Sequence, residues 1–62
     1  MTVQSDLNKA IASAQAAKGT YLMAAESTED QSAKDRYQQM ASDMDVHLEY
    51  LSSRLDYLSS QF

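Results

Sequence analysis

A row of apolar residues runs along the second half of this chain at alternating spacings of four and three residues. Such spacing places every member on one face of an α-helix, whereas a β-strand would need apolar residues at every second position. A disordered chain of polar composition would show no such period. The pattern therefore predicts a helix with a coiled-coil seam. The seam is made of Tyr37, Ala41, Met44, Leu48, Leu51, Leu55, Leu58 and Phe62.

Large apolar residues are otherwise scarce, which makes their concentration in this row informative. Val, Ile, Leu and Phe together number ten of the 62 residues, a level at which disorder has to be considered. The length allows a single domain over residues 1–62, and a core of that size is marginal without a disulfide, a metal or self-association. Because the chain has no cysteine, disulfides and thiolate zinc sites are excluded.

The charge balance narrows the classes of partner. Five basic and nine acidic residues give a net charge of −4, which argues against nucleic-acid binding and against an anionic membrane surface. No apolar run is long enough to span a bilayer, and the N-terminus lacks the charged start and apolar stretch of a signal peptide. We therefore expect a soluble, cytoplasmic, acidic protein.

A weaker apolar row predicts a first helix over about residues 3–26. Most of its members are alanines, so helix propensity is high while each contact is small. Gly19 interrupts this helix at a cost of about 1 kcal/mol relative to alanine. It is either simply tolerated or part of a small-residue face, with Ala12, Ala16 and Met23, that another helix approaches. The apolar row itself consists of Val3, Leu7, Ala10, Ala14, Ala17, Tyr21 and Ala24, widened by Ile11 and Ala25.

The apolar pattern stops near residues 27–28, which are predicted to form the turn. Thr28 and Gln31 fit a capping box, and Glu29 and Asp30 would place negative charge at the positive end of the helix dipole. The second helix is therefore expected over about residues 29–60. Asp30 and Lys34 are expected to form an ion pair along it.

These two helices predict an all-α fold, an antiparallel hairpin. In a rough register Leu7 faces Leu48 and Ile11 faces Met44. Lengths of roughly 22 and 32 residues make the second helix longer by about 15 Å, which leaves its last apolar residues uncovered. Overhang and small core together predict a homo-oligomer, most simply a dimer forming a four-helix bundle, or else a larger helical assembly. The uncovered residues are Leu55, Leu58 and Phe62.

Arg54 draws attention because no acidic residue lies three or four positions away in its own helix. It either anchors an interface with another chain or lays its stem over Leu58 with its head in water. Lys18 also lacks an acidic neighbour and is expected in solvent. A second stripe, made of Val46, Tyr50 and Tyr57, occupies another face of the same helix. The predicted interface consists of Tyr37, Met44, Leu48, Leu51, Arg54, Leu55, Leu58 and Phe62.

The single histidine is the one candidate for metal chemistry. Asp43 and His47, four residues apart, would together chelate a metal, particularly if a dimer axis brought two copies of the pair together. The Glu-x-x-His motif of di-iron bundles is absent, because Met44 stands three residues before His47. We therefore expect no metal and no cofactor, and keep an Asp43/His47 site in a helical bundle as the alternative.

Catalysis is not expected from this chain. One glycine cannot form a phosphate-binding loop, and the serines form no Ser-His-acid arrangement. The residues favour a small non-catalytic protein that self-associates and has a structural or protein-interaction role. A third reading is an amphipathic helix that docks on a larger protein or a membrane.

Several short stretches of the chain together carry a resemblance to a known family. They are Met1–Val3, Ile11–Ala16, Thr28–Gln31 running into Ala33, Lys34 and Tyr37, and Leu51 followed by Arg54. Together they resemble a family of very short proteins from endospore-forming bacteria, known as domain of unknown function sixteen-fifty-seven. The resemblance implies a role in sporulation, with a place in the forespore or spore. It implies no catalytic residue.

Overall fold

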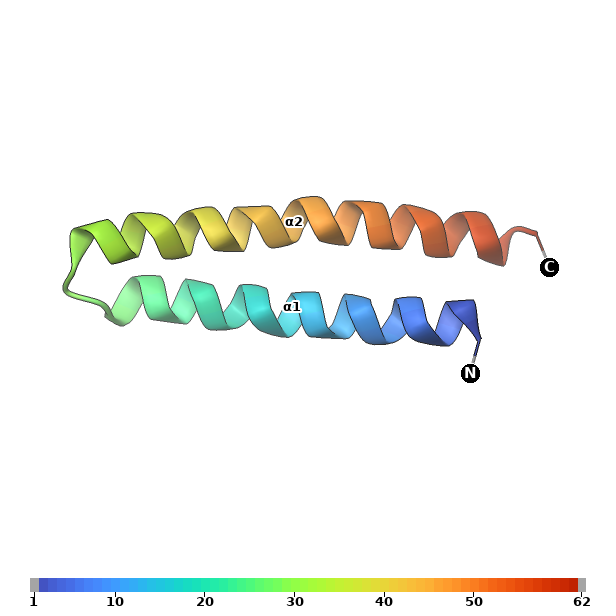
Figure 1. The fold of residues 1–62 in the computed structure, drawn as a ribbon, viewed down its shortest axis with the longest axis horizontal. Helices are drawn as coiled ribbons and strands as arrows, with labels where there is room; N and C mark the ends of the chain where they lie inside the picture. The colour runs from blue at the N-terminus through green and yellow to red at the C-terminus, as the bar shows by residue number, and fades with distance from the viewer. Residues whose placement is uncertain (1, 62) are drawn as a thin grey trace.

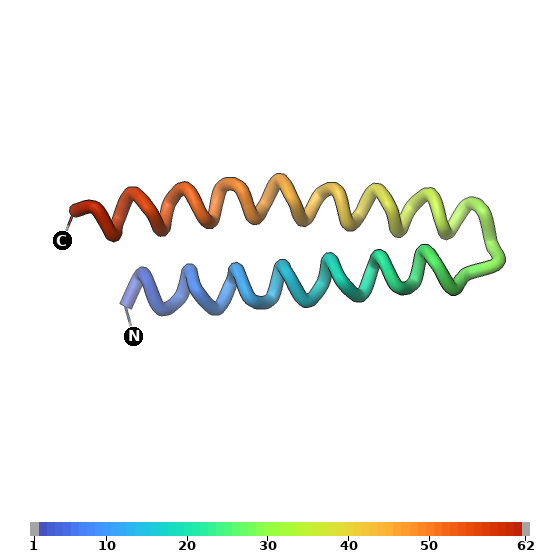
Figure 2. The backbone as a smooth tube through the Cα atoms, turned by 180° about the vertical axis from the view of Figure 1, so that it is seen from behind, coloured from blue at the N-terminus to red at the C-terminus, as the bar shows by residue number. Residues whose placement is uncertain are grey.

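The computed structural model describes residues 2–61 as two α-helices that lie side by side and antiparallel (Figures 1 and 2). Helix α1 spans Val3–Ser27 and helix α2 spans Gln31–Ser59. No strand occurs between residues 2 and 61, so the predicted all-α hairpin is confirmed. Phe62, the last member of the predicted seam, lies outside the described residues.

Helix α1 begins at Val3, the first apolar residue of its row. The Oγ1 of Thr2 accepts a hydrogen bond of 3.0 Å from the backbone N–H of Ser5, which caps the helix. Asp6 adds negative charge to the first turn, where the helix dipole favours it. At the other end the Ser27 hydroxyl donates to the carbonyl of Met23 at 3.1 Å, and the helix ends there.

Helix α2 begins at Gln31, two residues later than predicted, and its cap is Asp30 rather than Thr28. The Oδ1 of Asp30 accepts from the N–H groups of Ser32 and Ala33, at 3.0 and 3.4 Å. The Thr28 hydroxyl instead accepts from the N–H of Asp30 at 3.2 Å, within the loop. The predicted capping box of Thr28 and Gln31 is therefore wrong, because aspartate caps at least as well as threonine and stands closer to the orphan N–H groups.

The overhang of α2 beyond α1 is also smaller than predicted. Helices α1 and α2 have 25 and 29 residues, so their lengths differ by about 6 Å rather than about 15 Å. Leu55 and Leu58 are half-buried and thus partly covered within their own chain, contrary to the expectation that they lack cover.

The later start of α2 also shifts the pairing of the helices. The loop over residues 28–30 is centred on residue 29, so cross-helix neighbours move by about three residues, close to one helical turn. By the position of the loop Leu7 is level with Leu51, one turn along α2 from Leu48, and the predicted pairings of Leu7 with Leu48 and Ile11 with Met44 stay predictions. Ala25 and Lys34, which line one depression near the loop, are level in the observed register.

The hairpin is a single layer of two helices and has almost no interior. Its Cα extents are 49 × 18 × 11 Å, and its radius of gyration is 14.4 Å, against about 11 Å for a compact domain of this length. Only two described hydrophobic residues, Ala25 and Ala41, are buried, at 4% and 3% exposure. No large side chain between residues 2 and 61 is fully buried. The helices therefore touch along one line and leave two broad faces to the surroundings.

Candidate interaction surface

Six of the eight predicted interface residues of α2 lie on the line where the two helices meet. Five of its leucines and methionines, together with Tyr37, are half-buried, and Ala41 on the same line is buried. Because α1 supplies mostly alanines opposite them, the large side chains are covered on one side only. The half-buried members are Tyr37, Met44, Leu48, Leu51, Leu55 and Leu58.

One face of the hairpin is spanned by an ion pair, and we call it the bridged face. The Nζ of Lys18 lies 2.7 Å from the Oδ1 of Asp45, which joins α1 to α2. The expectation that Lys18 is simply solvated is therefore wrong. The sequence held a clue to this ion pair, because both Lys18 and Asp45 lack an opposite charge three or four residues away in their own helices. With 36% and 56% of these side chains exposed, the pair contributes little stability and chiefly helps to fix the register.

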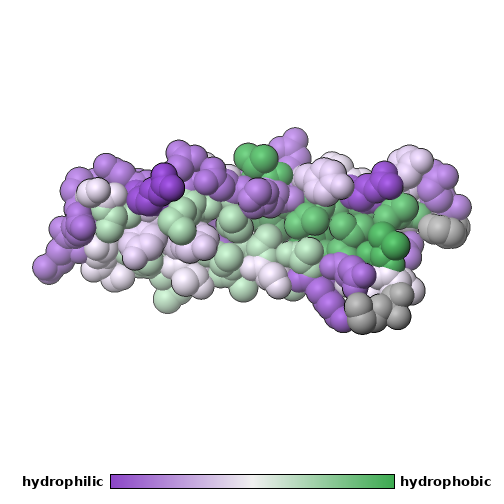
Figure 3. All heavy atoms as spheres, viewed as in Figure 1, coloured by the Kyte–Doolittle hydropathy of each residue, from purple (hydrophilic) through white to green (hydrophobic). Residues whose placement is uncertain are grey.

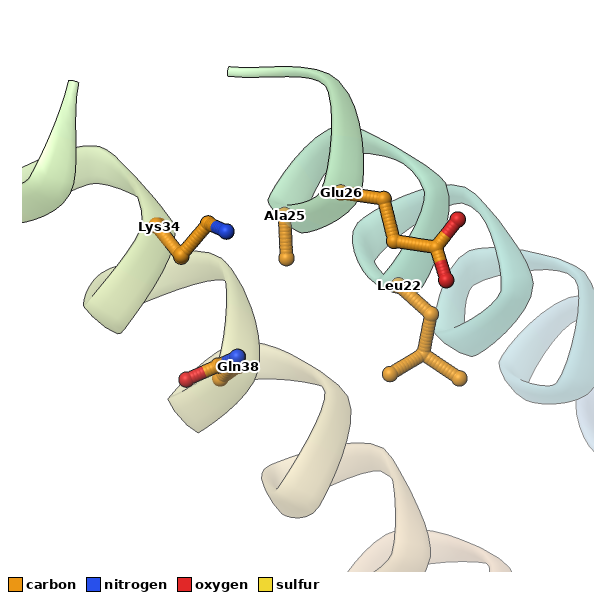
Figure 4. A pocket seen from close by; sticks show the side chains of 5 residues that line it. All are labelled: Leu22, Ala25, Glu26, Lys34 and Gln38. Atoms are coloured by element: carbon orange, nitrogen blue, oxygen red, sulfur yellow. The ribbon is translucent and has the colours of Figure 1, made fainter. Parts of the chain in front are cut away.

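A shallow depression of about 230 Å³ lies on the bridged face near the loop (Figure 4). Leu22, Ala25 and Glu26 of α1 and Lys34 and Gln38 of α2 line it. Its polar groups are one carboxylate, one ammonium and one amide, without a nucleophile or a histidine. Among these lining residues no general base is paired with a nucleophile.

The opposite side of the hairpin, which we call the open face, is apolar. On α1, residues spaced by seven form two rows that flank the line of contact, and the row containing Lys18 belongs to the bridged face. The other row, of alanines, therefore lies on the open face. On α2 the open face is formed by the half-buried residues on the side of the contact line away from Asp45. Figure 3 shows strongly hydrophobic side chains gathered over the end of this face that is farther from the loop. The open face comprises Ala10, Ala17, Ala24, Met40, Leu51 and Leu58, all half-buried.

No ion pair spans the open face within residues 2–61, because the single described ion pair is the one on the bridged face. Arg54 stands at the rim of the open face, exposed, with its guanidinium carbon 5.0 Å from the centroid of the Tyr57 ring. This distance fits a cation–π contact within α2. The predicted pairing of Asp30 with Lys34 does not form.

The second apolar stripe of α2 points away from α1. Val46, Tyr50 and Tyr57 are all more than half exposed. Met23 of α1 is likewise exposed, and nothing lies within 4 Å of a Cβ built at Gly19. These side chains thus lie largely outside the contact between the two helices.

The candidate metal pair lies on the exposed surface of α2 in the single chain. His47 and Asp43 are both exposed, and the Oδ1 of Asp43 accepts a hydrogen bond of 3.0 Å from the Nε2 of Gln39. Within the part of the chain that the structure describes, no group of three or more His, Asp or Glu side chains is placed to hold a metal ion.

No described helix is long and apolar enough to cross a membrane.

A family model described as protein of unknown function (DUF1657) matches residues 7–55, which include most of both helices and the whole loop. The chain belongs to the DUF1657 family. This confirms the family resemblance seen in the sequence. The DUF1657 match begins at Leu7 and ends at Leu55, so it contains the contact line of α2 from Tyr37 to Leu55, the ion pair of Lys18 with Asp45, and Arg54. No curated protein and no solved structure matches the chain.

Proposed function

We propose that the protein is a small non-catalytic protein that works by self-association, with a structural or protein-interaction role. In this proposal two copies pack their open faces together as a dimer and form a four-helix bundle. The observation that carries the proposal is the lack of an interior: among the described hydrophobic residues only two alanines are buried in the single chain.

The surface area of the hairpin supports this proposal. An unfolded chain of 6.9 kDa exposes about 10,000 Å², and the hairpin still exposes 4586 Å², so folding alone buries about 54%. A compact domain of this length buries about 60%. Packing the open face against a second copy would supply the missing burial, because that face carries half-buried Leu and Met side chains.

The cellular setting proposed here rests on the sequence resemblance and on charge. The resemblance to proteins of endospore-forming bacteria supports a role in sporulation, within the cytoplasm or the forespore. The net charge of −4 supports a protein partner rather than a nucleic acid. A second copy of the chain is the simplest such partner.

Sedimentation equilibrium across micromolar concentrations tests the proposal. We expect twice the 6.9 kDa mass of one chain, with helix content that falls on dilution as the dimer dissociates. A monomer that unfolds cooperatively at the same temperature at every concentration would overturn the proposal.

A matched pair of variants shows which face is used. Ala17→Glu places a charge in the half-buried alanine row of the open face and should abolish association. Ala16→Glu makes the same change at an exposed neighbouring position and should leave the dimer intact. Equal association of the two variants would show that the open face is not the interface.

A further inference from the structure

We infer that the two copies pack with their loops at the same end, so that Arg54 of each copy lies against Asp6 of the other. This inference rests on the proposed function and specifies the geometry of the same interface. The reasons are the shape of the open face and the positions of three charged residues along its rim.

Two symmetric arrangements bring open face to open face. In the same-end arrangement the two-fold axis runs parallel to the helices, and α2 of each copy lies over α1 of the other. In the opposite-end arrangement the axis runs across the helices, and α2 lies over α2 while α1 lies over α1. The two arrangements bury the same face, but they pair different side chains.

Side-chain size favours the same-end arrangement. On the open face α1 presents alanines, whereas α2 presents Met40, Leu51 and Leu58. Stacking α2 on α2 would place bulky rows against each other and would leave a gap between the two alanine rows. Stacking α2 on α1 sets the bulky row of each copy over the small row of the other, which is the interdigitation that dense packing requires.

Charge favours the same arrangement. Arg36 and Arg54 are 18 residues apart, about five helical turns, so they lie on one line along α2. Both stand nine residues from Asp45, the midpoint of α2. Opposite-end packing would therefore bring Arg36 of one copy against Arg54 of the other, a repulsive contact between like charges.

Same-end packing brings Arg54 to a carboxylate instead. In the observed register Arg54 is level with the first turn of α1, which contains Asp6. Asp6 is exposed, and neither it nor Arg54 forms an ion pair within the described hairpin. Because α2 of one copy then lies over α1 of the other, the two unpaired charges meet across the rim of the interface.

Cysteine cross-linking tests this geometry without background, because the natural chain has no cysteine. We expect that an equimolar mixture of Asp6→Cys and Arg54→Cys proteins, mildly oxidised, forms a mixed disulfide dimer, and that neither variant alone does. His47→Cys serves as the contrasting probe. Residue 47 stands on the rim close to the midpoint of α2. Opposite-end packing would therefore bring the two copies of this residue together. In same-end packing the two α2 helices lie diagonally across the bundle, so the two residues would stay apart.

The outcomes separate the two proposals. A protein that sediments as a dimer but cross-links through His47→Cys alone, or fails to form the mixed disulfide, overturns the same-end geometry and leaves self-association standing. A protein that sediments as a monomer at every concentration overturns both. Sedimentation of each cysteine variant under reducing conditions, compared with the natural chain, shows whether the substitution itself disturbs association.

Discussion

Asp30 decides where α2 begins, because one of its carboxylate oxygens accepts from two backbone N–H groups that would otherwise lack partners. Residues 26–32 are all polar, and the spacing of Thr28 and Gln31 favoured Thr28 as the cap. Which of several adjacent caps is used depends on the path of the loop, and no periodicity reports that path. Because α1 also ends one residue later than predicted, the expected register of the hairpin moves by about three residues.

The Asp30 cap leads to a stability prediction. Asp30→Ala should lower the free energy of unfolding by about 1 kcal/mol, because the N–H groups of Ser32 and Ala33 lose their acceptor. At this size the midpoint of thermal unfolding should fall by about 4–8 °C, measured by circular dichroism at one fixed concentration. Asp30→Asn, which keeps the acceptor oxygen, should lose much less. A larger loss from Thr28→Ala than from Asp30→Ala would contradict the assignment of the cap.

Gly19 leads to a prediction of opposite sign. Its added Cβ would meet nothing within 4 Å, and the residue lies inside α1 on an exposed surface. Gly19→Ala should therefore raise the free energy of unfolding by about 1 kcal/mol, the difference in helix propensity, and leave the oligomeric state unchanged. A variant that sediments differently from the natural chain would show that Gly19 belongs to a close helix–helix contact, and thus that the outer surface of α1 takes part in assembly.

At the scale of the element, both helices were predictable from apolar spacing. Six predicted members of the α2 row are half-buried and one is buried, because a four-three spacing permits no other regular structure. In α1, Val3 is the exception, because it stands in the first turn at the open end of the hairpin and its side chain remains 64% exposed. The ion pair of Lys18 with Asp45 could not be predicted as a pair, because it depends on the register and hence on the loop.

Leu51 tests whether the row of α2 holds the hairpin together. Leu51→Asp should abolish folding, because it places a charge on the line of contact without a partner. Far-ultraviolet circular dichroism should show loss of the helical spectrum. Tyr50→Asp is the matched control at the adjacent position, where 66% of the side chain is exposed, and it should retain the helical melt. An unchanged melt in Leu51→Asp would refute the assignment of the row.

At the scale of the whole molecule, the hairpin is long and thin, and its two faces differ. The bridged face carries the described ion pair and a shallow depression, and the open face carries alanine on one helix and Leu and Met on the other. The sequence analysis predicted that another chain covers apolar surface left exposed by the hairpin, but it placed that surface at the overhanging end of the second helix. The structure places the uncovered surface along the side of the hairpin, because the two helices are more nearly equal in length than the pattern suggested.

The near absence of an interior has a consequence for how such a protein is regulated. If most burial comes from the second copy, mass action makes the chain its own stabilising ligand. Each tenfold fall in concentration then removes about 1.4 kcal/mol from the stability of the proposed dimer. The rate of synthesis would then decide whether the chain persists as a folded dimer or is exposed to proteases as a dissociated single chain. Abundance would thus serve as the switch, with no effector required.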